Sequence, residues 1–221
     1  MSTSQAIRKR IGVSPVGAPF TPALFAGLGS RAAIDQTLMR MTQAGEIERI
    51  GHGLYMVPKV GKFGVKPLPA PEQIAQTVAQ ADGAKIEIHG AEAARRFGLT
   101  TQVPAQAVFY TTGSSRAIRL GKMIVRLQHV APRKLALAGR PAGQALSALW
   151  YLGRQHVTPN TFKQIEAKLP AAEFQVLRES KSLMPVWMAE ILNRYESSEH
   201  AQPLRSVPVR RVVSGAAGGV A

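Results

Sequence analysis

Residues 30–57 read SRAAIDQTLMRMTQAGEIERIGHGLYMV, and this stretch changes its periodicity halfway. Its first half repeats apolar residues at steps of four and three, at Ile34, Leu38 and Met41. This spacing places the three side chains on one face of a helix. We therefore expect a helix from residue 31 to about residue 44, with that face buried.

The ends of this helix are marked by residue type. Ser30 is a favoured N-cap, because its hydroxyl can accept a backbone N–H of the first turn. Gly45 can adopt the left-handed conformation that ends many helices. Two short apolar runs then flank a Gly-His-Gly turn at residues 51–53, which predicts a β-hairpin.

Two more helices are expected before this stretch. One covers residues 3–11, and the other covers residues 23–26, where Thr21-Pro22 offers an N-cap followed by proline at the first helical position. Three helices and a hairpin within fewer than 60 residues are typical of a winged helix-turn-helix, in which the third helix enters the major groove of DNA.

The rest of the chain predicts a larger α+β domain. Strands are expected at residues 85–88, 107–111, 117–120 and 123–127, and helices at 70–81, 90–97, 142–152, 161–169, 171–181 and 184–195. The fold class is therefore α+β: an N-terminal winged helix-turn-helix followed by a larger α+β domain with a C-terminal helical layer. The boundaries are 1–58 for the winged helix, 59–69 for a linker rich in Gly and Pro, 70–196 for the α+β domain, and 197–221 for a flexible basic tail.

The net charge is the most informative feature of the composition. The chain has 28 Lys and Arg against 13 Asp and Glu, a formal charge of +15. Two blocks hold most of the excess: residues 1–66 carry net +6 and residues 85–140 carry net +8. Such a surplus favours a polyanionic partner, most often nucleic acid.

On the third helix, polar residues lie opposite the apolar face. Gln36 can pair with adenine, and Arg31 and Arg40 can contact guanine or phosphate. Ser30 and the helix N-terminus can hold a phosphate. The alternative is an ordinary solvated helix face, but the basic charge and the hairpin that follows favour DNA contact.

The hairpin is expected to gather Arg49, His52 and Lys59 around one tip that contacts the DNA backbone. Arg49 is the stronger candidate, since an exposed turn histidine without a role explains His52 almost as well. Leu54 and Tyr55 are expected to anchor the hairpin to the core.

In the second basic block, Arg116, Arg119 and Arg126 are the candidates for DNA contact. Arg119 and Arg126 should point outward from their strands, with apolar neighbours packed inside: Ile118, Ile124 and Leu127. A solvated sheet face is the alternative.

Enzymatic chemistry finds no support in the sequence. Gly27–Ala32 fits a loose G-x-G-x-x-A pattern, but no βαβ unit surrounds it. Gly113-Ser114 resembles the start of a nucleotidyltransferase motif, but no pair of aspartates follows. The chain has no cysteine, and its five histidines form no metal or triad signature. We therefore expect no catalysis, metal or cofactor. The sequence shows no signal peptide and no apolar run of membrane length, so we expect a cytoplasmic protein.

Several short motifs together resemble the AbiEi-type antitoxins of type IV toxin–antitoxin systems, which act in bacterial abortive infection. The resemblance covers roughly residues 5–195. It is carried by Phe20-Thr21-Pro22, Leu28-Gly29-Ser30-Arg31, Ala33-Ile34-Asp35-Gln36, Leu38, Gly45-Glu46-Ile47, the run from Arg49 to Tyr55, Gly98–Ala105 and Ala131-Pro132-Arg133.

The resemblance implies a transcriptional autorepressor that binds inverted repeats of double-stranded DNA at its own promoter, as a monomer that binds cooperatively. It also implies an antitoxin that opposes a nucleotidyltransferase-like toxin without forming a stable complex with it. The alternative reading is a stand-alone nucleic-acid- or protein-binding module with no toxin partner.

Overall fold

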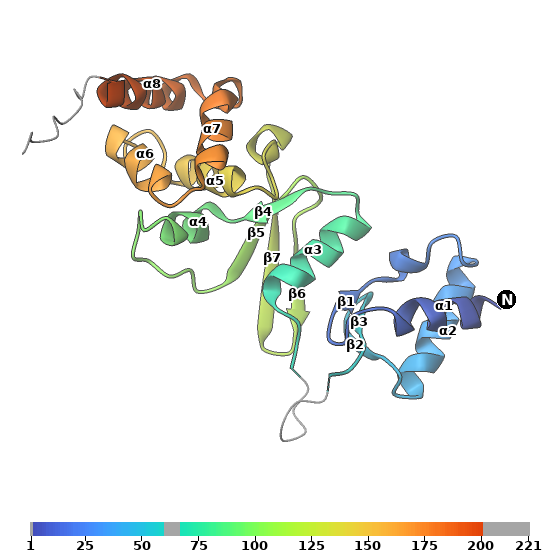
Figure 1. The fold of residues 1–221 in the computed structure, drawn as a ribbon. Coiled ribbons are helices and arrows are strands. Elements are labelled where there is room, and N and C mark those ends of the chain that lie inside the picture. The colour runs from blue at the N-terminus through green and yellow to red at the C-terminus, as the bar shows by residue number, and fades with distance from the viewer. Residues whose placement is uncertain (1, 60–66, 201–221) are drawn as a thin grey trace, which may run out of the picture.

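The protein is described by a computed structural model that covers residues 2–59 and 67–200 (Figure 1). It is a mixed α+β structure. Most of the expected linker and most of the expected tail lie outside the described residues. None of the helices within the described part has the length and apolar character that crossing a bilayer requires.

The N-terminal segment (residues 2–59) is mostly helical before its hairpin. Its elements are α1 (Thr3–Gly12), β1 (Pro19–Phe20), the 3₁₀ helix η1 (Pro22–Phe25), α2 (Arg31–Gln43), β2 (Glu48–Gly51) and β3 (Leu54–Met56). The side-chain oxygen of Ser30 accepts the Ala33 N–H at 3.3 Å, and Gly45 has a φ of 72°. Both expected ends of α2 are thus confirmed, whereas the helix expected at residues 23–26 is a single 3₁₀ turn.

The strands of this segment form a small antiparallel sheet in the order β1-β3-β2. Its two faces meet different cores. Tyr55 stacks on Phe20 and packs against the apolar cluster of α1, η1 and α2. Leu54, one residue earlier, points the other way and belongs to the apolar cluster of the C-terminal segment. Both residues expected to anchor the hairpin to the core thus pack on apolar clusters, but on different ones.

The C-terminal segment (residues 67–200) contains one four-stranded sheet and most of the helices. Its elements are α3 (Pro71–Ala81), β4 (Ile86–Ile88), α4 (Gly90–Arg96), β5 (Ala107–Thr111), β6 (Arg116–Leu120), β7 (Met123–His129), η3 (Pro132–Leu135), α5 (Pro141–Leu152), α6 (Pro159–Glu166), α7 (Ala171–Glu179), η4 (Ser180–Leu183) and α8 (Val186–His200). Every helix and strand expected between residues 70 and 195 is present, with ends shifted by a few residues.

The sheet has the order β4-β5-β7-β6, with β5 and β7 parallel and the other two pairs antiparallel. Helix α3 covers the inner face of this sheet, where Val125 and Leu127 are buried. Arg126 and Ile124 alternate with them and lie on the outer face. The expectation that Ile124 packs inside is therefore wrong, because it shares the pleat direction of Arg126.

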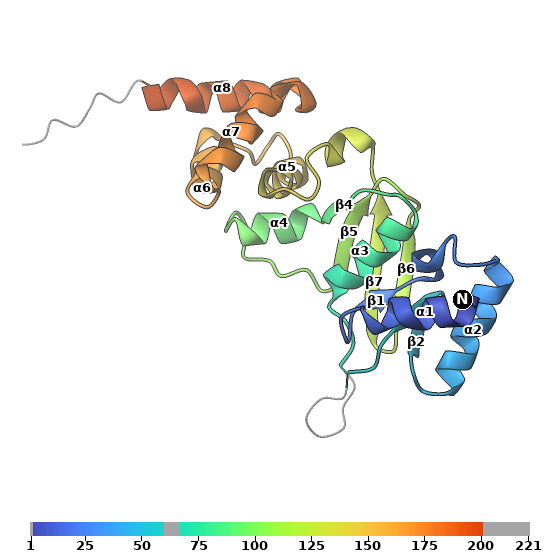
Figure 2. The same cartoon turned by 45° about the vertical axis from the view of Figure 1, so that its right-hand side comes forward.

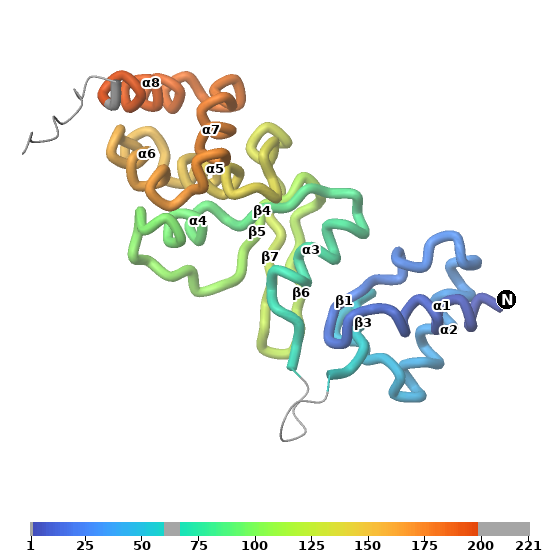
Figure 3. The backbone as a smooth tube through the Cα atoms, in the orientation of Figure 1, coloured from blue at the N-terminus to red at the C-terminus, as the bar shows by residue number. Residues whose placement is uncertain are grey.

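The helical layer of α5–α8 lies at one end of the sheet, and the N-terminal segment lies at the other (Figures 1 and 2). Helices α4 and α5 cross so closely at Gly90 that a Cβ there would stand 2.5 Å from the carbonyl oxygen of Ser147. Helix α5 is buried along most of its length. The backbone tube in Figure 3 shows that α1 and α8 are far apart.

The N-terminal segment packs directly on the C-terminal segment. The hydroxyl of Thr77 in α3 donates to the carbonyl oxygen of Pro19 in β1 at 3.3 Å. At the hairpin tip, a Cβ on Gly51 would stand 3.7 Å from the carbonyl oxygen of Arg119 in β6. With Leu54 only 1% exposed between them, the hairpin is held against α3 and β6.

Candidate nucleic-acid interface

Helix α2 separates its side chains into a buried face and an exposed face. Ile34 and Leu38 are 4% and 0% exposed. Arg31, Gln36 and Arg40 are all exposed. The capping and the four–three apolar spacing therefore hold these three side chains toward solvent, as the sequence predicts.

Hydrogen bonding decides what each of these groups can offer a ligand. The Arg31 Nε donates to Asp35 at 2.8 Å, so its charge is balanced within the first turns of the helix. The Ser30 oxygen accepts a backbone N–H, which leaves its own O–H for a ligand. The side chains of Gln36 and Arg40 make no hydrogen bond with any residue that the structure describes.

The three cationic candidates of the hairpin do not gather at one tip. His52 is exposed at the turn, and the Nε of Arg49 donates to the carbonyl oxygen of Gly51 at 3.3 Å. Lys59 lies beside Gly17, where a Cβ added to the glycine would stand 3.6 Å from the Cβ of Lys59. Lys59 lies away from the tip because β3 separates it from His52, and each extended residue of that strand carries the chain about 3.3 Å further from the turn. The expectation that Lys59 joins the tip is therefore wrong.

The strand arginines also fall into separate places. Arg119 and Arg126 lie on the outer face of the sheet, as expected, and the Arg126 Nε donates to Gln106 at 2.6 Å. Arg116 has the opposite pleat direction and forms an ion pair with Asp82 at the end of α3. Of the three, only Arg119 has a side chain without a partner among the described residues.

One groove brings four of the candidates together. It has a volume of ≈ 590 Å³ and lies between the N-terminal segment and β6. Its lining includes Arg31, His52, Arg116 and Arg119. The groove joins parts of the chain that are more than 60 residues apart, and no spacing in the sequence indicates this.

Several other arginines are held by carboxylates that sequence reasoning did not pair. Arg95 and Arg96 both donate to Glu92, at 2.7 and 2.9 Å. These hydrogen bonds, that of Arg95 above all, lower the pKa of Glu92 to about 2. Arg8 donates to Glu46 at 2.7 Å and lowers the pKa of that carboxyl. The basic surface available to a ligand is therefore smaller than the formal charge suggests.

Arg133 also has a structural role. Its guanidinium donates to the carbonyl oxygens of Leu183 and Ser182, at 2.9 and 3.2 Å. These bonds hold the turn between α7 and α8 against η3. The guanidinium of Arg133 is therefore engaged by the backbone.

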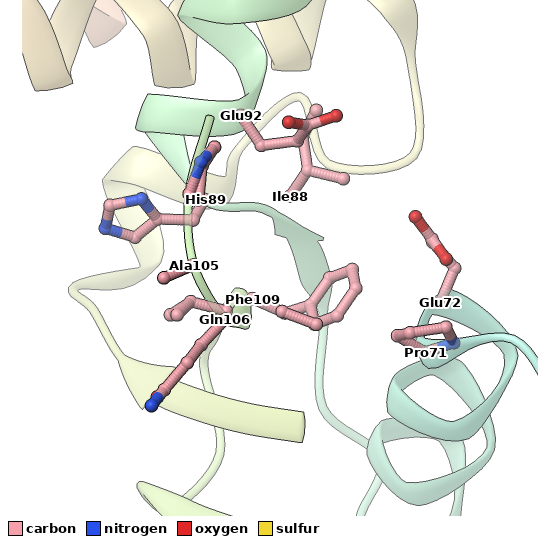
Figure 4. A pocket seen from close by; sticks show the side chains of 11 residues that line it. Pro71, Glu72, Ile88, His89, Glu92, Ala105, Gln106 and Phe109 are labelled. Atoms are coloured by element: carbon pink, nitrogen blue, oxygen red, sulfur yellow. The ribbon is translucent and has the colours of Figure 1, made fainter. Parts of the chain in front are cut away.

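A second, smaller pocket of ≈ 230 Å³ lies between α3 and the end of β4 (Figure 4). His89 and Phe109 line it, with Pro71 and Glu72 on the α3 side. The His89 Nδ1 accepts the Ala91 N–H at 3.1 Å and so caps α4. Burial lowers the pKa of this histidine. Capping explains its position without a catalytic role.

Glu87 is the one charged residue that the described structure buries fully, at 6% exposure. Its carboxylate accepts the N–H groups of Ile88 and Gly139, at 2.9 and 3.0 Å. Burial raises its pKa, against the effect of these hydrogen bonds. It ties β4 to the loop before α5, and is structural. Among residues 2–59 and 67–200, no group of three or more potential metal ligands is found.

These features define a basic α+β protein with an exposed, arginine-bearing helix face and a groove between its two segments. The chain belongs to DUF6088, a family of unknown function, whose profile matches residues 6–176, from α1 into α7. No curated protein and no solved structure matches the chain.

Proposed function

We propose that this protein is a sequence-specific DNA-binding repressor in which residues 2–59 act as a winged helix-turn-helix. The observation that carries the proposal is the solvent face of α2. It presents Arg31, Gln36 and Arg40 from a helix whose opposite face is buried. A capped N-terminus precedes this face, and a hairpin paired with β1 follows it.

In this proposal α2 is the recognition helix. The side chains of Gln36 and Arg40 are bonded to none of the described residues, so they can reach base edges in the major groove. Ser30 and Arg31 stand at the N-terminus of α2, where backbone N–H groups and the helix dipole favour a phosphate. Base reading would therefore centre on the middle of α2, and phosphate contact on its beginning.

The hairpin has a more limited part than a free wing would have. One of its faces is covered by α3 and β6, so only its edge and tip remain for DNA. Arg49 lies on that edge, as the exposed cation of β2. Arg119 and Arg126 extend the basic surface onto the sheet, where phosphate contact would add affinity without sequence preference.

The antitoxin role rests on the resemblance to the AbiEi-type family. It would make the protein a repressor of its own promoter, bound at inverted repeats, and the antagonist of a nucleotidyltransferase-like toxin. Catalysis has no part in this role. The second candidate function is a stand-alone binding module. It is favoured by Met39, which is 52% exposed on the same face of α2. This side chain could contact an apolar protein surface as well as the methyl group of thymine.

The test is binding of the full chain to the DNA upstream of its own gene, measured at several salt concentrations against a scrambled duplex of equal length. We expect a preference for the upstream fragment, and a slope of log K on log salt of about −0.9 for each phosphate contact. Equal affinity for both duplexes would reject the repressor role.

Variants assign the contacts. Arg40→Ala should cost about 1–3 kcal/mol on the specific duplex and less on the scrambled one if Arg40 reads a base. Arg154→Ala removes an exposed arginine outside the proposed interface and is the matched control. Co-expression with the neighbouring gene tests the antitoxin role, which fails if that gene product is harmless or if its toxicity is unchanged.

A further inference from the structure

The groove between the two segments has the form of a small-molecule site. Its walls come from η1, the first turn of α2 and the hairpin on one side, and from the end of α3 and β6 on the other. It exists only because the hairpin is docked on the C-terminal segment. Its ≈ 590 Å³ fall within the roughly 300–1,000 Å³ of ligand pockets, which often lie between domains.

The polar lining of this groove has an excess of N–H donors. Arg116 and Asp82 neutralise one another. Arg119 and His52 add donors that are bound by no residue that the structure describes. Arg31 contributes the guanidinium nitrogens that Asp35 does not engage. An anionic group with several acceptor oxygens matches this lining, because charge-assisted hydrogen bonds to guanidinium are strong.

The rest of the lining is apolar. Leu54 and Pro22 are buried beneath the groove, and Val78 and Ile118 are half-buried in its walls. A ligand that fills the groove would therefore need an uncharged body beside its anionic group. The Asp82 carboxylate provides an acceptor for a hydroxyl or amino group on that body.

We propose that this groove binds a small phosphate ester of mononucleotide size. Its phosphate would lie at Arg119 and Arg31, and its ring would lie against the apolar wall. Because these residues belong to both segments, the bound ligand would bridge them. Arg31 and Arg119 are shared with the proposed DNA interface, whereas Gln36 and Arg40 do not line the groove. Mononucleotide binding can therefore be measured in the absence of DNA.

The test is calorimetric titration of the full chain with four mononucleotides, AMP, CMP, GMP and UMP, and with adenosine as the phosphate-free comparison. We expect at least one mononucleotide to bind saturably. If AMP is that ligand, adenosine should bind at least about tenfold more weakly, and a tenfold difference in affinity corresponds to about 1.4 kcal/mol. If none of the four saturates at about 5 mM, a free energy of only about −3 kcal/mol, the proposal is overturned.

Two variants locate the ligand. Arg119→Gln should weaken mononucleotide binding about tenfold or more, and Ala117→Trp, which fills the groove from an exposed position of β6, should abolish it. Arg154 is exposed, lies away from the groove and is paired with no residue in the described part of the chain. Arg154→Gln is therefore the charge-matched control and should change affinity less than about twofold. Equal losses for Arg119→Gln and Arg154→Gln would reject the groove as the site.

Duplex binding, measured for the same variants, distinguishes a mononucleotide phosphate from the phosphates of the DNA backbone. A mononucleotide that binds in the groove should do so without DNA. If Arg119→Gln affects only duplex binding, and no mononucleotide binds, the groove is a contact for the DNA backbone and the proposal fails.

Discussion

Truncation of Leu54 measures how tightly the two segments are joined. Leu54 is 1% exposed, so Leu54→Ala removes three fully buried carbons, about 2.4 kcal/mol at about 0.8 kcal/mol per carbon. The cavity left behind adds to this loss, and measured Leu→Ala changes of this kind span about 2–5 kcal/mol. We expect a decrease in the free energy of unfolding within that range.

The assay is urea denaturation, followed by far-ultraviolet circular dichroism and by the fluorescence of Trp150 and Trp187, which both lie in the helical layer. The two signals should coincide in the wild type. They should separate in Leu54→Ala, because the N-terminal segment then loses the contact that couples its unfolding to that of the C-terminal segment. Leu24→Ala is the control: Leu24 is 38% exposed and should lose less than about 1 kcal/mol. Equal losses for the two variants, or coincident transitions in Leu54→Ala, would refute the account of the hairpin as the joint between segments.

Three further predictions concern local structure. Ser30→Ala should destabilise the protein by about 1 kcal/mol in the same denaturation assay, because the cap of α2 is lost. Ser30→Asp should retain most of the stability, because aspartate also caps helices. The pKa of Glu92 is about 2 in the folded state, below its ordinary value of 4.5. This carboxylate therefore stabilises the fold above pH 4.5, and the contribution is lost as the pH falls toward 2. The free energy of unfolding should fall less steeply over this range in Glu92→Gln than in the wild type, and parallel curves would contradict this. Gly143→Ala should lower the free energy of unfolding by about 1–3 kcal/mol or more, because a Cβ there would collide with the carbonyl oxygen of Leu137. Gly12→Ala is the control and should be neutral or stabilising, because a Cβ there meets no described atom within 4 Å. Similar melting temperatures for the two variants would exclude the collision.

The local structure of this protein could be predicted well from its sequence. The N-cap Ser30, the terminal Gly45 and the apolar spacing between them determine α2, because capping and helical periodicity act over only a few residues. The same holds for the strand that carries Arg126, whose outward direction follows from alternation. The prediction failed for Ile124 because it followed the apolar character of the side chain. Ile124 is two residues from Arg126, so alternation places both on the exposed face of the sheet.

The candidate site depended much more on the tertiary structure. Residue types and charge marked Arg31, His52, Arg116 and Arg119 one by one, but nothing local indicated that they line one groove, or that Asp82 neutralises Arg116. Lys59 was expected at the hairpin tip because it is near His52 in sequence, yet an extended strand separates the two.

The sequence by itself determined the helices, the strands, the basic charge and the exposed face of α2, since each follows from side chains within a few residues of one another. Only the tertiary structure decided that the hairpin packs against β6 and α3, and therefore that a groove forms between the segments. That packing depends on which apolar side chain, Leu54 or Tyr55, enters which core. Neighbouring residues on a strand point in opposite directions, so the choice is made by surfaces that meet only after the whole chain has folded.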